Sequence, residues 1–287
     1  MSEWSSWSAP AKINLFLHII GRREDGYHEL QTAFQLLDHC DVVHLRRRDD
    51  ACIVRAKAIP GVAAEDDLTI RAAQQLQAES GTSWGVELWV EKRLPAGGGL
   101  GGGSSDAATV LLALDHIWGL NLGRDRLADL GLQLGADVPV FVRGRSAWAQ
   151  GVGEVLEPLP KDIAESNWYL VVDPGVEVAT AQVFRDPGLT RNTLAIKIAD
   201  LHAGQVKNDC EAVVSLNWPE VGSVLEWLSQ YGRARMSGTG ACCFVPFAQE
   251  SAARQALDRL PSQWSGFACR GTAESKVECE LAEVTAK

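Results

Sequence analysis

The sequence lacks the features that mark membrane and secreted proteins. Its 287 residues contain no run of about 18 apolar residues, so no membrane-spanning helix is expected. The N-terminal stretch Met-Ser-Glu-Trp-Ser-Ser-Trp has no basic segment followed by an apolar one, which argues against a signal peptide. The seven cysteines are odd in number and show no Cys-x-x-Cys spacing, which predicts reduced, mostly buried thiols. We therefore expect a cytoplasmic protein without membrane contacts.

An excess of basic residues is also missing. The formal net charge is -10 at pH 7, which argues against broad nucleic-acid binding because such proteins usually present a basic face. The histidines show no metal-ligand spacing, so no protein-bound metal site is predicted. Hydrophobic residues make up 46% of the chain, enough to build a packed core. The length suits two domains or one large one, and the sequence does not determine the oligomeric state, with a monomer or weak homodimer expected.

Patterns of apolar residues predict an α+β protein in two halves. Residues 9–20 alternate as a strand that turns Lys12 and Asn14 to the side opposite its odd-numbered apolar residues. Residues 138–157 predict a β-hairpin, and the last predicted element is a strand near residues 266–270. The pattern breaks at Glu157-Pro158-Leu159-Pro160. We therefore expect an N-terminal domain of residues 1–158 and a C-terminal domain of residues 159–287.

The segment from Gly97 to Gly103 has glycine at six of its seven positions. It lies between a predicted strand and an apolar helix, unlike a linker between independent domains. It fits Gly-x-Gly-x-x-Gly, but a second strand ending in an acid does not follow, as a dinucleotide fingerprint requires. It also lacks the Walker lysine. A phosphate-binding loop of another design remains, in which Ser104, Ser105 or Asp106 can cap the following helix.

Several motifs resemble those of the GHMP kinases, the family of galactokinase and of the homoserine, mevalonate and phosphomevalonate kinases. They are Pro10-Ala-Lys-Ile-Asn-Leu15, the loop with its flanks, and Ser237-Gly-Thr-Gly-Ala241. The resemblance spans nearly the whole chain. It implies a two-domain fold, with an N-terminal domain like the second domain of ribosomal protein S5 and a ferredoxin-like C-terminal domain. It also implies that ATP is the co-substrate and that Mg²⁺ arrives with it.

Longer stretches resemble one branch of that family. They run from Lys12 to Leu30, from Leu134 to Phe141 and from Asn208 to Glu211. The resemblance implies that ATP phosphorylates the 2-hydroxyl of 4-diphosphocytidyl-2-C-methyl-D-erythritol, in the non-mevalonate route to isopentenyl diphosphate. The partners implied are therefore small molecules. Another acceptor within the family, or a nucleotide-binding protein that has lost catalysis, remains an alternative.

The resemblance assigns roles to individual residues. Asp137 matches the catalytic base and Lys12 the catalytic cation, although from the residues alone Asp137 could cap a turn and Lys12 could lie on the surface. Asn14 matches a contact to the erythritol part. The other substrate-binding residues implied are Tyr27, His28, Thr180 and Phe184. The residues implied to bind ATP are Pro95, Ala96, Gly97, Gly98, Gly99, Leu100, Gly101, Gly102, Gly103, Ser104 and Ser105.

Overall fold

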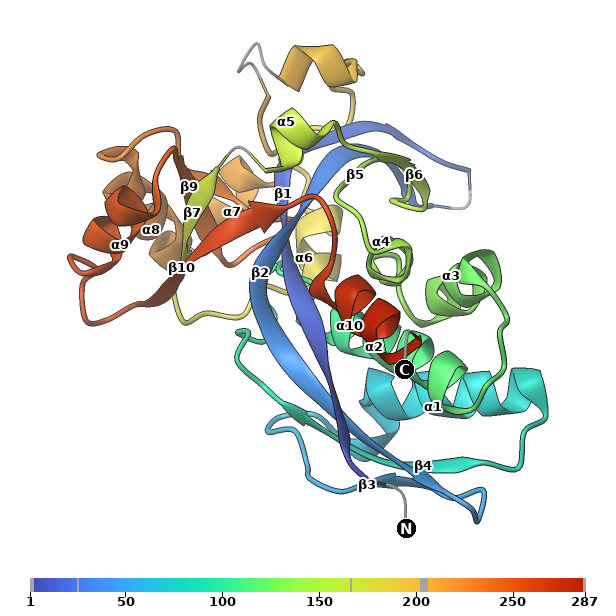
Figure 1. The fold of residues 1–287 in the computed structure, drawn as a ribbon. Helices are drawn as coiled ribbons and strands as arrows, with labels where there is room; N and C mark the ends of the chain where they lie inside the picture. The colour runs from blue at the N-terminus through green and yellow to red at the C-terminus, as the bar shows by residue number, and fades with distance from the viewer. Residues whose placement is uncertain (1–2, 25, 166, 202–205, 286–287) are drawn as a thin grey trace.

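The computed structural model describes residues 3–24, 26–165, 167–201 and 206–285 and has the α+β organisation that the sequence predicts (Figure 1). In these ranges the strands are β1 (Ser5–Arg22), β2 (His28–Arg48), β3 (Ile53–Arg55), β4 (Gly85–Glu91), β5 (Ala147–Gly151), β6 (Val155–Pro158), β7 (Trp168–Asp173), β8 (Arg235–Met236), β9 (Cys243–Phe247) and β10 (Ser265–Thr272). The helices are η1 (Ala64–Asp66), α1 (Leu68–Ser80), α2 (Gly102–Ile117), α3 (Arg124–Leu134), α4 (Val138–Arg143), α5 (Lys161–Ala164), α6 (Thr180–Arg185), η2 (Ile198–Leu201), α7 (Glu211–Asn217), α8 (Pro219–Ser229), α9 (Glu250–Leu257) and α10 (Lys276–Thr285). None of the helices within those ranges is long and apolar enough to cross a lipid bilayer.

One sheet runs through both halves of the molecule. Its main path is β3-β4-β2-β10-β7-β9-β8, while β1 and β5 also pair with β2. The two long strands β1 and β2 pair antiparallel from Ser5↔Leu45 to Arg22↔His28. Strand β10 pairs with β7 along most of its length and with β2 at Gly271 and Thr272, and so joins the two halves.

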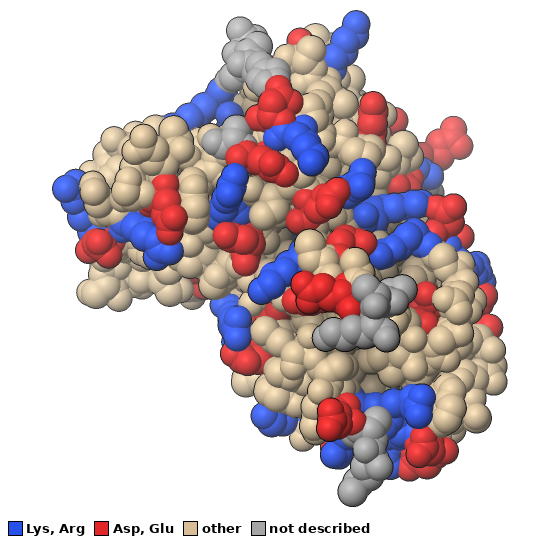
Figure 2. Space-filling model, in the orientation of Figure 1, with Lys and Arg blue, Asp and Glu red and all other residues tan. Residues whose placement is uncertain are grey.

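The first half buries its core between the sheet and a layer of helices. Figure 1 shows α1, α2, α3 and α4 on one side of β1 and β2. The apolar stretch 107–114 of α2 is buried throughout, as expected for a helix that has no polar face. Leu36, Val43 and Leu45 of β2 pack into the same core. On the face shown in Figure 2, basic and acidic side chains lie intermixed over both halves.

The second half has the order of a ferredoxin-like sheet. Strands β10, β7, β9 and β8 lie side by side and antiparallel. Helices α6, α7 and α8 fall between β7 and β8 in the chain, and α9 falls between β9 and β10. This β-α-β-β-α-β order is the ferredoxin-like arrangement, as the sequence resemblance implies. Its core contains Val172, Val214, Val224 and Val245.

The C-terminal helix α10 follows β10 of the second half in the chain but packs on the first half. It contacts β1 and α2, and Val277 joins the first core. Glu280 accepts hydrogen bonds from Ser8 N and Ser8 Oγ at 2.8 and 2.6 Å. The sequence patterns did not predict this helix. The division into residues 1–158 and 159–287 stays a prediction. Helix α10 belongs to the second of these segments in the chain but packs on the first.

Two local predictions from the sequence were wrong. Residues 138–143 form helix α4 instead of the first strand of a hairpin, and only β5 and β6 form that hairpin. A short, fully buried apolar run cannot distinguish strand from helix by its pattern, while Pro139 in the first turn favours a helix start. Ser104, Ser105 and Asp106 do not cap α2, because the helix already begins at Gly102.

Candidate active site

The glycine loop leads from the end of β4 into the first turn of α2. Gly97, Gly99 and Gly101 have φ values of 67°, 72° and 72°, a left-handed conformation that glycine adopts at little cost. Lys12 N donates to Leu100 O at 2.9 Å, which fixes the middle of the loop against β1. The first amide N–H groups of α2 lack hydrogen-bond partners within the helix and form the positive end of its dipole. The loop therefore suits an anionic group such as phosphate.

The second glycine turn, residues 237–240, packs directly against this loop. Ser237 Oγ donates to Gly99 O at 2.8 Å, and Cys242 N donates to Gly98 O at 3.0 Å. Asn208 Nδ2 donates to two carbonyl oxygens at and beside the turn, at 2.7 and 2.9 Å. The motif segments of the second half thus hold the loop of the first half in position.

A cavity of about 500 Å³ opens beside the glycine loop. Loop residues 95–104 and residues between Ile59 and Thr69 both line it. Asp67 fixes the second of these segments, because it caps α1 through Thr69 N at 3.0 Å and pairs with Arg55 at 2.8 Å. The volume falls in the range of small-molecule sites, and the loop places phosphate-binding groups at its edge.

Lys12, Asn14 and Asp137 meet at the base of the loop. Lys12 Nζ lies 3.2 Å from Asp137 Oδ2 and donates to Asn14 Oδ1 at 2.6 Å. Lys12 and Asn14 are each only 3% exposed, so Lys12 is not a surface lysine. Asn14 Nδ2 in turn donates to Thr32 Oγ1 at 2.9 Å, which fixes its amide orientation. The cation therefore has a defined position beside the carboxylate.

The carboxylate of Asp137 remains 34% exposed. Asp137 immediately precedes α4, but its side chain makes no capping hydrogen bond to that helix. The alternative in which it only caps a turn therefore finds no support in its contacts. A carboxylate held beside a buried ammonium and open to solvent can accept a proton from a bound hydroxyl.

A buried charge cluster lies behind the start of α2. Lys92 Nζ donates to Asp106 Oδ2 at 2.8 Å and also pairs with Asp41 Oδ2. Asp41 Oδ1 accepts the N–H of Leu94 at 2.8 Å. Burial, together with the nearby charge of Asp41, raises the pKa of Asp106 to about 7, against the lowering effect of Lys92. Lys92 and Asp106 both line the cavity, so this cluster borders the proposed ATP site.

The predicted substrate residues His28 and Phe184 are in contact. Their rings stack with centroids 4.9 Å apart and planes inclined by 19°. Arg191 Nε donates to His28 Nε2 at 3.1 Å. Tyr27 precedes His28 and is 66% exposed. The remaining predicted residue, Thr180, lies at the start of α6, with its hydroxyl 2.8 Å from that of Thr239 in the second glycine turn.

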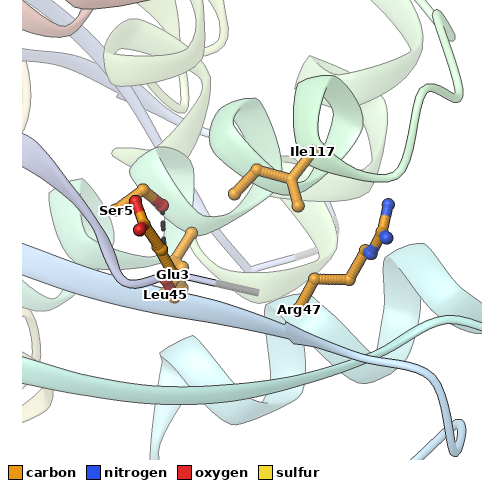
Figure 3. Close-up of a pocket in the computed structure, with 5 residues that line it drawn as sticks. All are labelled: Glu3, Ser5, Leu45, Arg47 and Ile117. Atoms are coloured by element: carbon orange, nitrogen blue, oxygen red, sulfur yellow. Dashed lines mark hydrogen bonds between the residues drawn. The ribbon is translucent and has the colours of Figure 1, made fainter. Parts of the chain in front are cut away.

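A second hollow, of about 300 Å³, has no connection with these residues. Its lining residues are Glu3, Ser5, Leu45, Arg47 and Ile117. Figure 3 shows Glu3, Ser5 and Leu45 gathered on one side, with Ile117 and Arg47 toward the other. Ser5 Oγ donates to Leu45 O at 3.2 Å there. None of these five residues was predicted to bind a ligand.

The structure brings the predicted residues into two groups. Lys12, Asn14 and Asp137 adjoin the glycine loop, while His28 and Phe184 form a separate aromatic contact. The sequence patterns did not single out Lys92 or Arg191. Lys92 follows an alternating strand, and a charged residue in that position predicts only contact with solvent. The available signal for a role at the site was its position three residues before Pro95, where the glycine loop begins. Arg191 lies in a segment without periodicity and carries no such signal.

Comparisons with known proteins identify the family of the chain. The model of the GHMP kinases N terminal domain matches residues 67–145, and that of the GHMP kinases C terminal matches residues 189–266. A 4-diphosphocytidyl-2-C-methyl-D-erythritol kinase of Halorhodospira halophila is 62% identical over 283 residues, covering 99% of this chain and 98% of its own. The kinase of the same name from Thiobacillus denitrificans is 56% identical over 266 residues, covering 93% and 95%.

Solved structures give the same result. A crystal structure of 4-(cytidine 5'-diphospho)-2C-methyl-D-erythritol kinase superposes with a TM-score of 0.79 at 33% identity, covering 93% of this chain and all of that one. Homoserine kinase from Cytophaga hutchinsonii superposes with a TM-score of 0.71 at 16% identity, covering 96% and 97%, which shows the shared fold. The chain therefore has the two-domain α+β fold of the GHMP kinases and belongs to that family, among relatives named 4-diphosphocytidyl-2-C-methyl-D-erythritol kinase.

Proposed function

We propose that the chain transfers the γ-phosphoryl group of ATP to the 2-hydroxyl of 4-diphosphocytidyl-2-C-methyl-D-erythritol, in the non-mevalonate route to isopentenyl diphosphate. The observation that carries the proposal is the 3.2 Å contact between Lys12 Nζ and Asp137 Oδ2 beside the glycine loop. Phosphoryl transfer to an alcohol needs held phosphates, neutralised charge and an acceptor for the hydroxyl proton. The names of the similar kinases support the choice of acceptor.

The glycine loop would hold the triphosphate of ATP. Residues 95–104 contribute backbone N–H groups, the hydroxyl of Ser104 and the positive end of α2, while Ser105 is fully buried. The cavity beside the loop would take the rest of the nucleotide. The hydrogen bonds from Ser237 and Cys242 keep the loop from moving when phosphate binds, which lowers the cost of ordering it.

Asp137 and Lys12 would act on the acceptor hydroxyl. Asp137 accepts or orients the hydroxyl proton, which raises the nucleophilicity of the oxygen as the bond to phosphorus forms. Lys12 stabilises the negative charge that develops between the hydroxyl and the γ-phosphate. Its burial strengthens this interaction, because a charge in a low-dielectric site is weakly screened.

The acceptor molecule would reach from Lys12, Asn14 and Asp137 to the aromatic contact of His28 and Phe184. Asn14 presents its amide next to Lys12 and would hydrogen-bond the erythritol part. Tyr27, His28 and Phe184 would contact the cytosine base, since aromatic faces stack on bases and an imidazole can bond to a base edge. Thr180 would contribute a hydroxyl on the same side.

Mg²⁺ would enter with ATP, held largely by phosphate oxygens and water, as is usual for this ion. The residues present fit such a loosely held ion. Within the described part of the chain, no three His, Cys, Asp or Glu side chains cluster as a metal cage. Asp106 lines the cavity, and its buried Oδ1 has no hydrogen-bond partner among those residues. Asp106 would hold the ion or its water, and the ion would neutralise phosphate charge.

We also propose a cytoplasmic enzyme, a monomer or weak homodimer, that binds small molecules and no nucleic acid. The formal charge of -10 supports the last point, because a polyanion would meet a net-negative protein. Sedimentation at several concentrations tests the oligomeric state. A stable trimer or larger assembly would contradict the proposal.

The central test measures ATP-dependent phosphorylation of 4-diphosphocytidyl-2-C-methyl-D-erythritol by the parent chain and by Asp137→Asn. The variant keeps the shape of the side chain but removes the proton acceptor, so we expect kcat to fall by at least about 10²-fold. Asp125→Asn is the matched control, since Asp125 is 89% exposed and pairs with Arg143 at the surface. Unchanged turnover in Asp137→Asn would refute the base assignment.

Competition by cytidine 5'-diphosphate tests the alternative of another GHMP acceptor. Cytidine 5'-diphosphate should compete with the acceptor if the aromatic residues bind cytosine, and it should have no effect if the enzyme uses a different acceptor. A catalytically inactive nucleotide-binding protein would bind ATP yet phosphorylate no acceptor. Absence of competition, or ATP binding without phosphorylation, would overturn the proposed reaction.

A further inference from the structure

Arg191 makes an unusual contact for an arginine next to a substrate residue. Its Nε donates to His28 Nε2 at 3.1 Å, so its bond is to a ring nitrogen instead of a carboxylate. A guanidinium carries only donors and stays protonated at all physiological pH values. Nε2 of His28 must therefore offer its lone pair. In a neutral imidazole the proton then lies on Nδ1.

Three carbonyl groups hold the guanidinium in place. Its Nη2 donates to Phe184 O at 2.9 Å and to Asp186 O at 2.8 Å, and its Nη1 donates to Leu189 O at 3.1 Å. The side chain is therefore fixed by the last turn of α6 and by the backbone that follows it. Phe184, which supplies one of those carbonyls, also stacks its ring on His28. Phe184 therefore holds the face of the imidazole, and Arg191 holds its Nε2.

We propose that Arg191 is a positioning residue that holds His28 as the neutral Nδ1–H tautomer, so that this imidazole presents a hydrogen-bond donor to the cytosine base. The inference rests on the proposed placement of His28 at the cytosine subsite. Cytosine offers two acceptors on its pairing edge, N3 and O2, which a donating imidazole can match. A ring free to exchange tautomers would offer that donor only part of the time.

The charges around His28 favour the neutral ring that this arrangement needs. Burial lowers the pKa of His28, and the positive charges of Arg191 and of Arg22 at the end of β1 lower it further. Among the residues that the structure describes, the two groups that act on His28 electrostatically, Arg191 and Arg22, are both cationic, so protonation would add a third positive charge. The ring therefore stays neutral while Nε2 stays occupied by Arg191.

A purely structural role for Arg191 would also follow from its carbonyl contacts, and the two roles differ in what they change. Loss of loop order would affect the protein whether or not residue 28 is histidine. Loss of the tautomer would matter only when histidine is there. A double-mutant cycle between positions 191 and 28 separates them, because residues that act through each other are not additive.

The direct test is the ¹⁵N NMR signature of His28 in the unliganded full-length chain. We expect the Nδ1–H tautomer in the parent and a shift toward Nε2–H in Arg191→Met, with Arg185→Met as matched control. Arg185 is exposed at the end of α6. An Nε2–H signature in the parent overturns the proposal without any variant, so failure of Arg191→Met to fold would not protect it. This readout needs no substrate, so it is distinct from failure of the proposed reaction.

Binding supplies the second readout, with cytidine 5'-diphosphate as the probe. Loss of one oriented hydrogen bond should raise its Kd by about three- to tenfold in Arg191→Met, with the KM for ATP unchanged. In the His28→Ala background the same substitution should change Kd by less than about twofold. An equal loss in both backgrounds would mean that Arg191 only orders the loop, and would refute the positioning role.

Discussion

Substitution of Gly99 by alanine tests how the two glycine turns support each other. A Cβ at this position would lie 2.2 Å from Ser237 O and 3.0 Å from Gly240 O. Both contacts are to backbone, which cannot rotate away as a flexible side chain can. The second glycine turn must therefore move away from the loop, and the hydrogen bonds Ser237 Oγ→Gly99 O and Cys242 N→Gly98 O must lengthen or break.

The expected cost combines two effects. Alanine in the left-handed region at φ 72° costs about 1–2 kcal/mol, and two lost hydrogen bonds cost about 1 kcal/mol each. The free energy of unfolding should fall by about 3–4 kcal/mol. Gly119→Ala is the control, because Gly119 has φ 69° with nothing within 4 Å of its Cβ position. It should lose only the conformational part, about 1–2 kcal/mol.

Urea unfolding measures the stabilities, and initial rates measure the KM for ATP. A loop shifted by the clash should raise that KM by about tenfold or more, since about 1.4 kcal/mol corresponds to a factor of ten. Gly119→Ala should leave it near the parent value. Equal destabilisation of the two variants, with the KM for ATP unchanged, would refute the claim that the second turn holds the loop.

Two further predictions concern ionisation and thiol exposure. Because the pKa of Asp106 is raised from 3.8 to about 7, the folded state keeps a proton that the unfolded state has lost, so this group makes the free energy of unfolding fall as pH rises through that window. The melting temperature of Asp106→Asn relative to the parent should therefore rise across the same window, and a difference independent of pH would contradict this. Of the seven thiols, only Cys52 and Cys279 are exposed, so a thiol reagent should titrate two groups rapidly in the native chain and seven after unfolding. Rapid reaction of more than two native thiols would contradict the burial of the others.

Much of the fold follows from local patterns. The alternation around Lys12, the apolar helix after the glycine run and the strand near residues 266–270 were predicted within a few residues. Helix α4 was missed because residues 138–142 are all buried, and such a run has no polar face to reveal its period. Helix α10 was missed because its packing depends on β10 crossing from one half of the sheet to the other.

The sequence by itself determined the glycine loop, because the missing side chains that allow φ values near 70° are a local property. It also determined which residues resemble the catalytic and cytosine-binding groups. Only the tertiary structure decided that Lys12 and Asp137 share a 3.2 Å contact, and that Arg191 reaches His28. Those pairs are far apart in the chain, and β-sheet pairing and domain packing bring them together. Side-chain contacts between distant segments leave no periodic trace in the sequence.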